Sequence, residues 1–135
     1  REINSVVTFI TGHDASGDVP NSIDWAAIAA GSPVLVIYMA MKHLGKLSAC
    51  LIDAERGADE PVAIVSRAST PHQKVLESTL GDCAAAAAAA GIEPPALVVI
   101  GEVVRLRGGL DWLGALAGRA LVADPLGVKS RVKAG

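Results

Sequence analysis

Aromatic residues are scarce in this sequence of 135 residues, at 3% of the chain, although 51% of the residues are hydrophobic. A core therefore has to be built from valine, isoleucine, leucine and alanine, which pack well between helices and a sheet. The high hydrophobic content excludes an intrinsically disordered chain. At this length, the sequence predicts one domain that buries a substantial core.

An excess of charge of one sign is also absent, since the formal net charge is −2 and the isoelectric point is about 5.9. Nucleic-acid-binding domains are usually basic, so we expect no nucleic-acid partner. Basic residues do gather in the last third of the chain, where we expect a solvent-facing surface and keep an anion site as the alternative. These residues are Arg105, Arg107, Arg119, Lys129, Arg131 and Lys133.

Cysteine is limited to Cys50 and Cys83, which form no C-x-x-C pair. The sequence thus favours two ordinary thiols over a metal or redox site, in keeping with a reducing cytoplasm. No apolar run approaches the ~18 residues that cross a bilayer, so no membrane partner is expected. The opening segment does not resemble a signal peptide and has no initiator Met, so we expect a piece of a longer protein.

Recognisable catalytic motifs are missing. The chain contains no phosphate-binding G-x-x-x-x-G-K-[ST], no G-x-S-x-G and no H-E-x-x-H. The histidines, His13, His43 and His72, are far apart in the sequence, so we expect no metal site.

Short apolar runs that alternate with helix-like segments indicate an α/β fold, with a mainly parallel or mixed sheet flanked by helices. The expected strands are 6–11, 32–39, 62–65, an edge strand around 75–76, and 96–100. The expected helices are one capped by Ser22 and ending at Gly31, one stopped by Gly57, and an alanine-rich one from Cys83 to Gly91.

Three segments lie at the carboxyl ends of expected buried strands: Tyr38–Met41, Ser66–Pro71 and Gly101–Arg107. Ligands of open α/β sheets bind beyond the carboxyl ends of the strands, so we expect these segments to converge on one crevice. Small residues and a polarisable thioether would suit a flat heteroaromatic ligand such as adenine better than a phosphate. The alternative is that they are ordinary strand exits.

Four segments, in order, resemble the tetrapyrrole methylase family: VTFITGHDASG, VLVIYMAMKHL, PVAIVSRASTPHQKV and PPALVVIGEVVRLRGGLDW. The resemblance implies the second, carboxyl-terminal α/β domain of that fold over residues 1–112, with 1–20 as the link and first strand. The segment 113–135 would lie outside the family core. The amino-terminal domain, with its glycine-rich loop, would be absent from this sequence.

The family resemblance also implies a function: S-adenosylmethionine-dependent methylation of uroporphyrinogen III to precorrin-2, on the route to cobalamin and sirohaem. Family members are homodimers that hold the cofactor between two domains. No catalytic residue is expected within this chain, which should be inactive alone. Two alternatives stay open, namely a related tetrapyrrole methylase with another substrate and a non-catalytic dimerisation module.

Matching the family motifs position by position gives the expected site residues. The residues expected to contact S-adenosylmethionine are Tyr38, Met39, Ala40, Arg67, Ala68, Gly101 and Val103. Arg1 matches a family arginine that faces the tetrapyrrole, and its guanidinium could pair with a substrate carboxylate.

Overall fold

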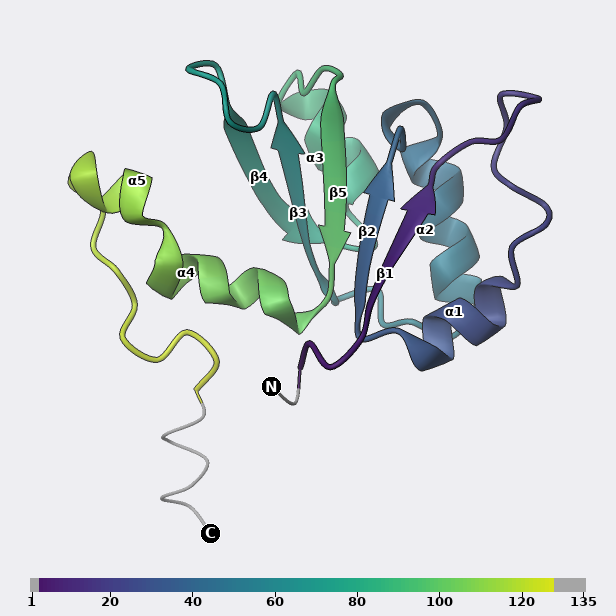
Figure 1. Cartoon of the computed structure of the whole chain (residues 1–135), viewed down its shortest axis with the longest axis horizontal. Coiled ribbons are helices and arrows are strands. Elements are labelled where there is room, and N and C mark those ends of the chain that lie inside the picture. The colour runs from purple at the N-terminus through teal and green to yellow at the C-terminus, as the bar shows by residue number, and fades with distance from the viewer. Residues whose placement is uncertain (1–2, 128–135) are drawn as a thin grey trace, which may run out of the picture.

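The computed structural model describes residues 3–127 (Figure 1). The five strands are β1 (Val7–Thr11), β2 (Val34–Tyr38), β3 (Pro61–Ser66), β4 (Lys74–Thr79) and β5 (Ala96–Ile100). The α-helices are α1 (Trp25–Gly31), α2 (Leu44–Asp53), α3 (Cys83–Ala89), α4 (Arg107–Leu110) and α5 (Trp112–Leu116). Two 3₁₀ helices, η1 (Met41–His43) and η2 (Glu102–Leu106), precede α2 and α4.

The strands form one mixed sheet in the order β1-β2-β5-β3-β4. Only β1 and β2 pair in parallel, whereas β5 pairs antiparallel with both β2 and β3, and β3 pairs antiparallel with β4. The α/β class is confirmed and the sheet is mixed, but the expectation of a mainly parallel sheet is wrong. A strand buried on both faces looks the same in the sequence whichever way it runs, so the direction of β5 could not be seen there.

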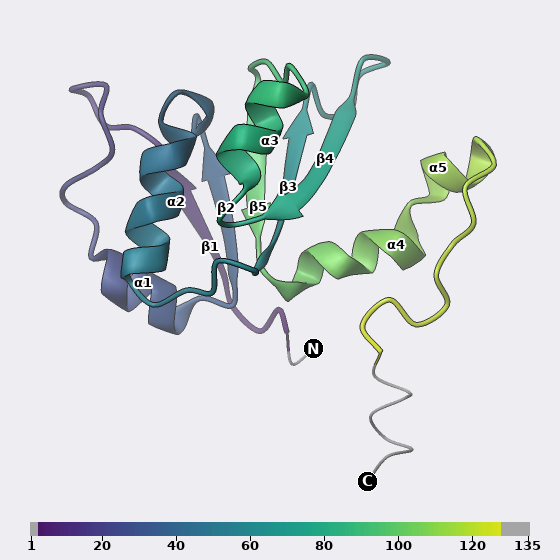
Figure 2. The same ribbon diagram turned by 180° about the vertical axis from the view of Figure 1, so that it is seen from behind.

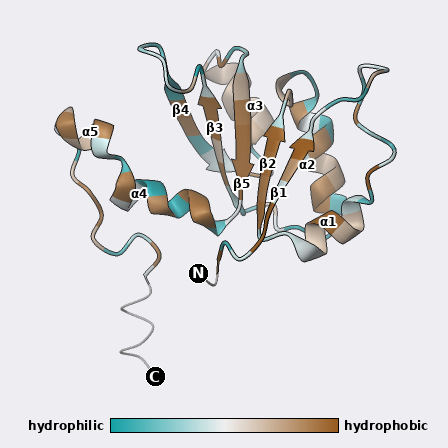
Figure 3. Ribbon diagram, in the orientation of Figure 1, coloured by the Kyte–Doolittle hydropathy of each residue, from teal (hydrophilic) through white to brown (hydrophobic). Residues whose placement is uncertain are grey.

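The hydrophobic core lies between the sheet and α1, α2 and α3, which all cover the same face (Figures 1 and 2). Figure 3 shows that the central strands are continuously hydrophobic. The alanines of α3 carry little bulk, so this helix can pack closely against its neighbours. The largest fully buried side chains are Leu35, Ile37, Leu47, Leu51, Ile64, Leu80, Ile100, Val62, Val98 and Cys83.

The element boundaries differ from the expectation at two helix ends. Asp24, rather than Ser22, caps α1, because its carboxylate accepts the amide hydrogen of Ala27 at 3.0 Å. Helix α2 ends at Asp53, before the expected stop at Gly57, because Glu55 adopts a left-handed backbone with φ of 69°. The expected edge strand is confirmed as β4.

The other face of the sheet carries exposed apolar side chains. Phe9 and Tyr38, on adjacent strands, are 66% and 47% exposed, and their ring centroids lie 6.4 Å apart. From the end of β5, η2, α4 and α5 lead away from the body of the sheet (Figures 1 and 2). Within residues 3–127, no helix has the length and hydrophobicity that crossing a membrane requires.

Candidate functional site

Strands β1, β2 and β3 all end at the same edge of the sheet. Strand β1 is parallel to β2, and both β2 and β3 run opposite to β5, so the three point the same way. Their exits bring Gly12, the segment Tyr38–Ala40 and the segment Arg67–Ala68 to one edge, as expected for two of the three predicted segments.

The third predicted segment lies at the opposite edge, because β5 is reversed. Gly101 follows the five residues of β5, which at about 3.3 Å per residue puts it roughly 15 Å from the edge that carries Met39. The predicted convergence of all three segments is therefore wrong for Gly101 and Val103. The glycine has a structural reason of its own: its φ is 135°, and a Cβ there would collide with the Pro33 carbonyl oxygen.

The exit of β2 combines a strained backbone with an exposed side chain. Met39 has a φ of 53° and is 52% exposed, whereas the next residue, Ala40, is completely buried. Gly12 packs against this turn: its N–H donates to the Tyr38 carbonyl at 2.6 Å, and a Cβ at Gly12 would come within 2.6 Å of the Ala40 Cα. Gly12, which follows β1, therefore holds the turn at the end of β2 in place.

The exit of β3 is strained in a similar way. Arg67 and Ser69 have φ values of 49° and 65°. The Thr70 hydroxyl donates to the Arg67 carbonyl at 2.7 Å, and the Arg67 N–H donates to the Pro95 carbonyl at 2.8 Å. Of the four non-glycine residues with positive φ in the described part of the chain, three lie at this one edge. Such backbone strain costs about 1 to 3 kcal/mol per residue and is typical of binding sites.

A hollow of about 440 Å³ opens between these exits and the start of β5. It is lined by Tyr38, Val65, Arg67, Ala68, Thr70, His72, Pro95, Ala96 and Leu97. Its wall is mainly apolar but includes the guanidinium of Arg67 and the imidazole of His72. Such a wall suits a flat, largely apolar ligand with a polar end. Three predicted cofactor residues, Tyr38, Arg67 and Ala68, line it.

The residues of this wall at the start of β5 were missed by sequence reasoning. Pro95, Ala96 and Leu97 reach the hollow because β5 starts at the edge where β2 and β3 end. Only the direction of β5 would have identified them. Arg1, the expected substrate residue, lies outside the described residues.

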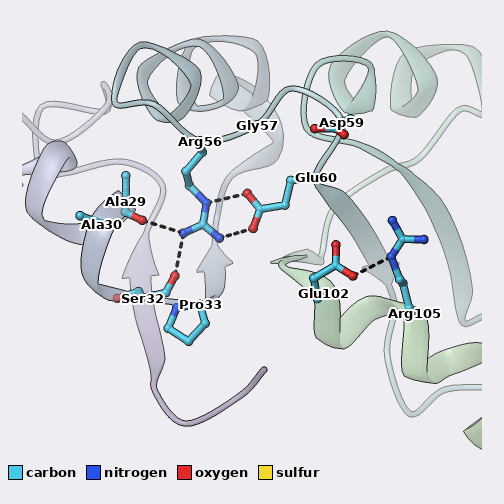
Figure 4. A pocket seen from close by; sticks show the side chains of 10 residues that line it. All are labelled: Ala29, Ala30, Ser32, Pro33, Arg56, Gly57, Asp59, Glu60, Glu102 and Arg105. Carbon is cyan, nitrogen blue, oxygen red and sulfur yellow. Dashed lines mark hydrogen bonds and ion pairs between the residues drawn. The ribbon is translucent and has the colours of Figure 1, made fainter. Parts of the chain in front are cut away.

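A second hollow, of about 410 Å³, lies at the opposite edge beside Arg56 (Figure 4). The Arg56 guanidinium pairs with both carboxylate oxygens of Glu60 and donates to the carbonyls of Ala29, at 3.2 Å, and Ser32, at 2.6 Å. The neighbouring Arg105 pairs with Glu102 at 2.8 Å. Both cations are already neutralised, so the contacts here stabilise the fold rather than offer an anion site.

No arrangement of three or more histidine, cysteine, aspartate or glutamate side chains within residues 3–127 could hold a metal ion. Burial raises the pKa of the Cys83 thiol, which keeps that group protonated and unreactive. The described residues of the candidate site offer an apolar surface together with the guanidinium of Arg67 and the imidazole of His72.

Replacing Met39 with glycine distinguishes the effect of its strained backbone on stability from the effect of its side chain on ligand binding. Glycine adopts positive φ freely, so we expect the free energy of unfolding in urea to stay level or rise by up to about 1 kcal/mol. In the full-length enzyme, loss of the thioether should weaken S-adenosylhomocysteine binding about tenfold, since burying such a side chain contributes roughly 1.5 kcal/mol. Loss of stability together with unchanged affinity would contradict this role for Met39.

Comparison with known proteins identifies the family to which this fold belongs. Residues 2–84 match the family described as tetrapyrrole (corrin/porphyrin) methylases. A uroporphyrinogen-III C-methyltransferase of Sinorhizobium sp. is 63% identical over 125 residues, which are 93% of this chain and 45% of the relative. A sirohaem synthase of Zymomonas mobilis is 41% identical over 115 residues, 85% of this chain and 24% of the relative.

Among solved structures, uroporphyrin-III C-methyltransferase from Thermus thermophilus, complexed with S-adenosylhomocysteine, is similar with a TM-score of 0.66. It is 29% identical, and the match covers 78% of this chain and 46% of that one. The chain thus spans less than half the length of these relatives. On its fold and on these matches, the chain belongs to the tetrapyrrole methylase family.

Proposed function

We propose that this chain forms one side of the S-adenosylmethionine site of a C-methyltransferase that acts on uroporphyrinogen III. The observation that carries the proposal is the edge where β2 and β3 end, with its strained exits at Met39 and Arg67 beside an apolar hollow. A relative of the same fold was solved with S-adenosylhomocysteine, the demethylated form of this cofactor.

The residues at this edge fit such a cofactor by their chemistry. The Met39 thioether offers a soft apolar contact, and the exposed Ala68 leaves room for a ligand to approach the backbone. The Tyr38 ring and Leu97 supply apolar walls for a flat base. Gly101 and Val103, which match family motifs but lie at the other edge, are the weakest members of the predicted set.

When bound, S-adenosylmethionine supplies an already activated methyl group on a sulfonium. The protein then has to orient that group, with the acceptor carbon about 3 to 3.5 Å away, and exclude water. This chain would contribute that positioning through Tyr38, Met39, Arg67 and Ala68, with the buried Ala40 supporting the turn behind Met39. Any proton transfer would come from residues outside it.

The acceptor we propose is uroporphyrinogen III, with precorrin-2 as product, because the Sinorhizobium relative carries that activity in its name. We further propose a cytoplasmic homodimer, with Arg1 near a carboxylate of the substrate. A related methylase with a later, corrin-type intermediate as substrate is the second candidate, since the family that matches is described as tetrapyrrole (corrin/porphyrin) methylases. The acceptor that is methylated in vitro separates the two.

The cofactor assignment can be tested in a chimera in which this chain replaces its aligned region in the Sinorhizobium enzyme. We expect Ala68→Leu to weaken S-adenosylhomocysteine binding in calorimetry by about 1 to 3 kcal/mol, because the added bulk fills the space for the ligand. The matched control is Ala88→Leu, on the exposed surface of α3, which should bind normally. Equal affinities in the two variants would refute the placement.

A further inference from the structure

The loop between β1 and α1, residues 12–24, is fixed at its start to the segment that carries Met39. At its start, the Gly12 N–H donates to the Tyr38 carbonyl at 2.6 Å. Further along, its tip is closed on itself: the Gly17 N–H donates to the Asp14 carbonyl and the Asp14 N–H to the Asp18 carbonyl, both at 2.9 Å. The tip is therefore a compact unit that needs an anchor on the rest of the fold.

His43 supplies that anchor. Its Nε2 lies 2.7 Å from the Gly17 carbonyl oxygen, and only 11% of its side chain is exposed. A carbonyl oxygen can only accept, so Nε2 must carry a hydrogen and act as the donor. His43 ends η1, four residues after Met39, so one short segment holds both the anchor and the predicted cofactor contact.

The other contacts of the tip are weaker. Lys46 donates to the Asp18 carboxylate at 3.1 Å, but both side chains are more than half exposed. The Val19 amide and the Lys46 ammonium hold the pKa of Asp18 below its usual value, so this carboxylate is ionised at neutral pH, 3.7 Å from His43 Nδ1. Of the described residues, none from 12 to 18 belongs to the hydrophobic core cluster.

We propose that His43 is a positioning residue that fixes the tip of this loop, residues 14–18, beside the β2 exit, so that the cofactor meets a preformed site. The inference rests on the proposed cofactor role of Met39. The site depends on this loop because Gly12 packs against the Met39 carbonyl and the Ala40 backbone, and a mobile loop would leave that turn unsupported. Preorganisation of this kind lowers the entropic cost of binding.

The test combines the order of the loop with the affinity of the site. In the 135-residue chain, His43→Ala should increase hydrogen exchange at the amides of Asp14 and Gly17 but leave those of the buried strand β2 unchanged. In the chimera, the same change should weaken S-adenosylhomocysteine binding about fivefold, as expected for the loss of one hydrogen bond.

His43→Gln should restore both measurements to within twofold, because the glutamine amide can also donate to the Gly17 carbonyl. Lys42→Ala, at an exposed position of the same 3₁₀ helix, is the matched control and should change neither. Unchanged exchange in His43→Ala, or faster exchange with unchanged affinity, would overturn the inference. A chimera that fails to bind S-adenosylhomocysteine with His43 intact would contradict the proposed function instead, and the exchange data would still decide whether His43 anchors the loop.

Discussion

Gly12→Ala is expected to destabilise the fold by about 3 kcal/mol and to abolish measurable binding of S-adenosylhomocysteine. A Cβ at this position would lie 2.6 Å from the Ala40 Cα and 2.7 Å from the Met39 carbonyl oxygen. Both atoms belong to backbone, so the strain cannot be relieved by turning a side chain. The β2 exit has to shift, and the predicted cofactor contacts of Met39 shift with it.

The matched control for this change is Gly31→Ala at the end of α1. Nothing lies within 4 Å of a Cβ built there, and alanine favours the helix, so stability should rise by about 0.5 to 1 kcal/mol. Urea unfolding and calorimetry measure the two effects separately. Wild-type stability and affinity in Gly12→Ala would show that the exits of β1 and β2 are not packed as described.

Arg56→Ala should lower the free energy of unfolding by about 3 kcal/mol, because it removes one partner of a buried ion pair. Only 7% of the Arg56 side chain and 18% of Glu60 are exposed, so Glu60 would be left as a poorly solvated charge. The change also removes the donor from the Ala29 and Ser32 carbonyls at the end of α1 (Figure 4).

Arg105→Ala provides the comparison for Arg56, since the same residue type pairs with Glu102 on the rim of the same hollow. This pair is about half exposed on both sides, so its loss should cost less than about 1 kcal/mol. Both variants should keep their affinity for S-adenosylhomocysteine, because the hollow at this edge is remote from Met39. Equal losses of stability would mean that burial does not distinguish the two pairs.

Most of the fold could be predicted from local sequence patterns. Strand β5 has the expected bounds, and the alanine-rich helix ends at Ala89, two residues before Gly91, which has a φ of 60°. Periodicity and turn residues act over a few positions, and these elements depend on little else. The direction of β5 is different, because it depends on which strands become neighbours, and no local pattern records that.

The candidate site, like the fold, could be predicted from the sequence only in part. Tyr38, Met39 and Ala68 could be named from a family resemblance, and two of them line the hollow. Gly101 was grouped with them because it matches a family motif and also follows a strand, and the reversal of β5 places it at the opposite edge. The contacts of His43 with Gly17 join residues 26 positions apart, so neither could be seen to matter before the fold was known.

The central claim is that this chain supplies one side of a methyl-transfer site, and methyl transfer by the Sinorhizobium chimera tests it most directly. The reactants are uroporphyrinogen III and S-adenosylmethionine, and only the latter is labelled, in its methyl group. We expect the chimera to form precorrin-2 that carries two labelled methyl groups. Met39→Gly and Ala68→Leu should reduce that rate, while Ala88→Leu should leave it unchanged. A folded chimera that binds S-adenosylhomocysteine but transfers no methyl group to this acceptor would contradict the proposed substrate, and one that binds neither ligand would contradict the account as a whole.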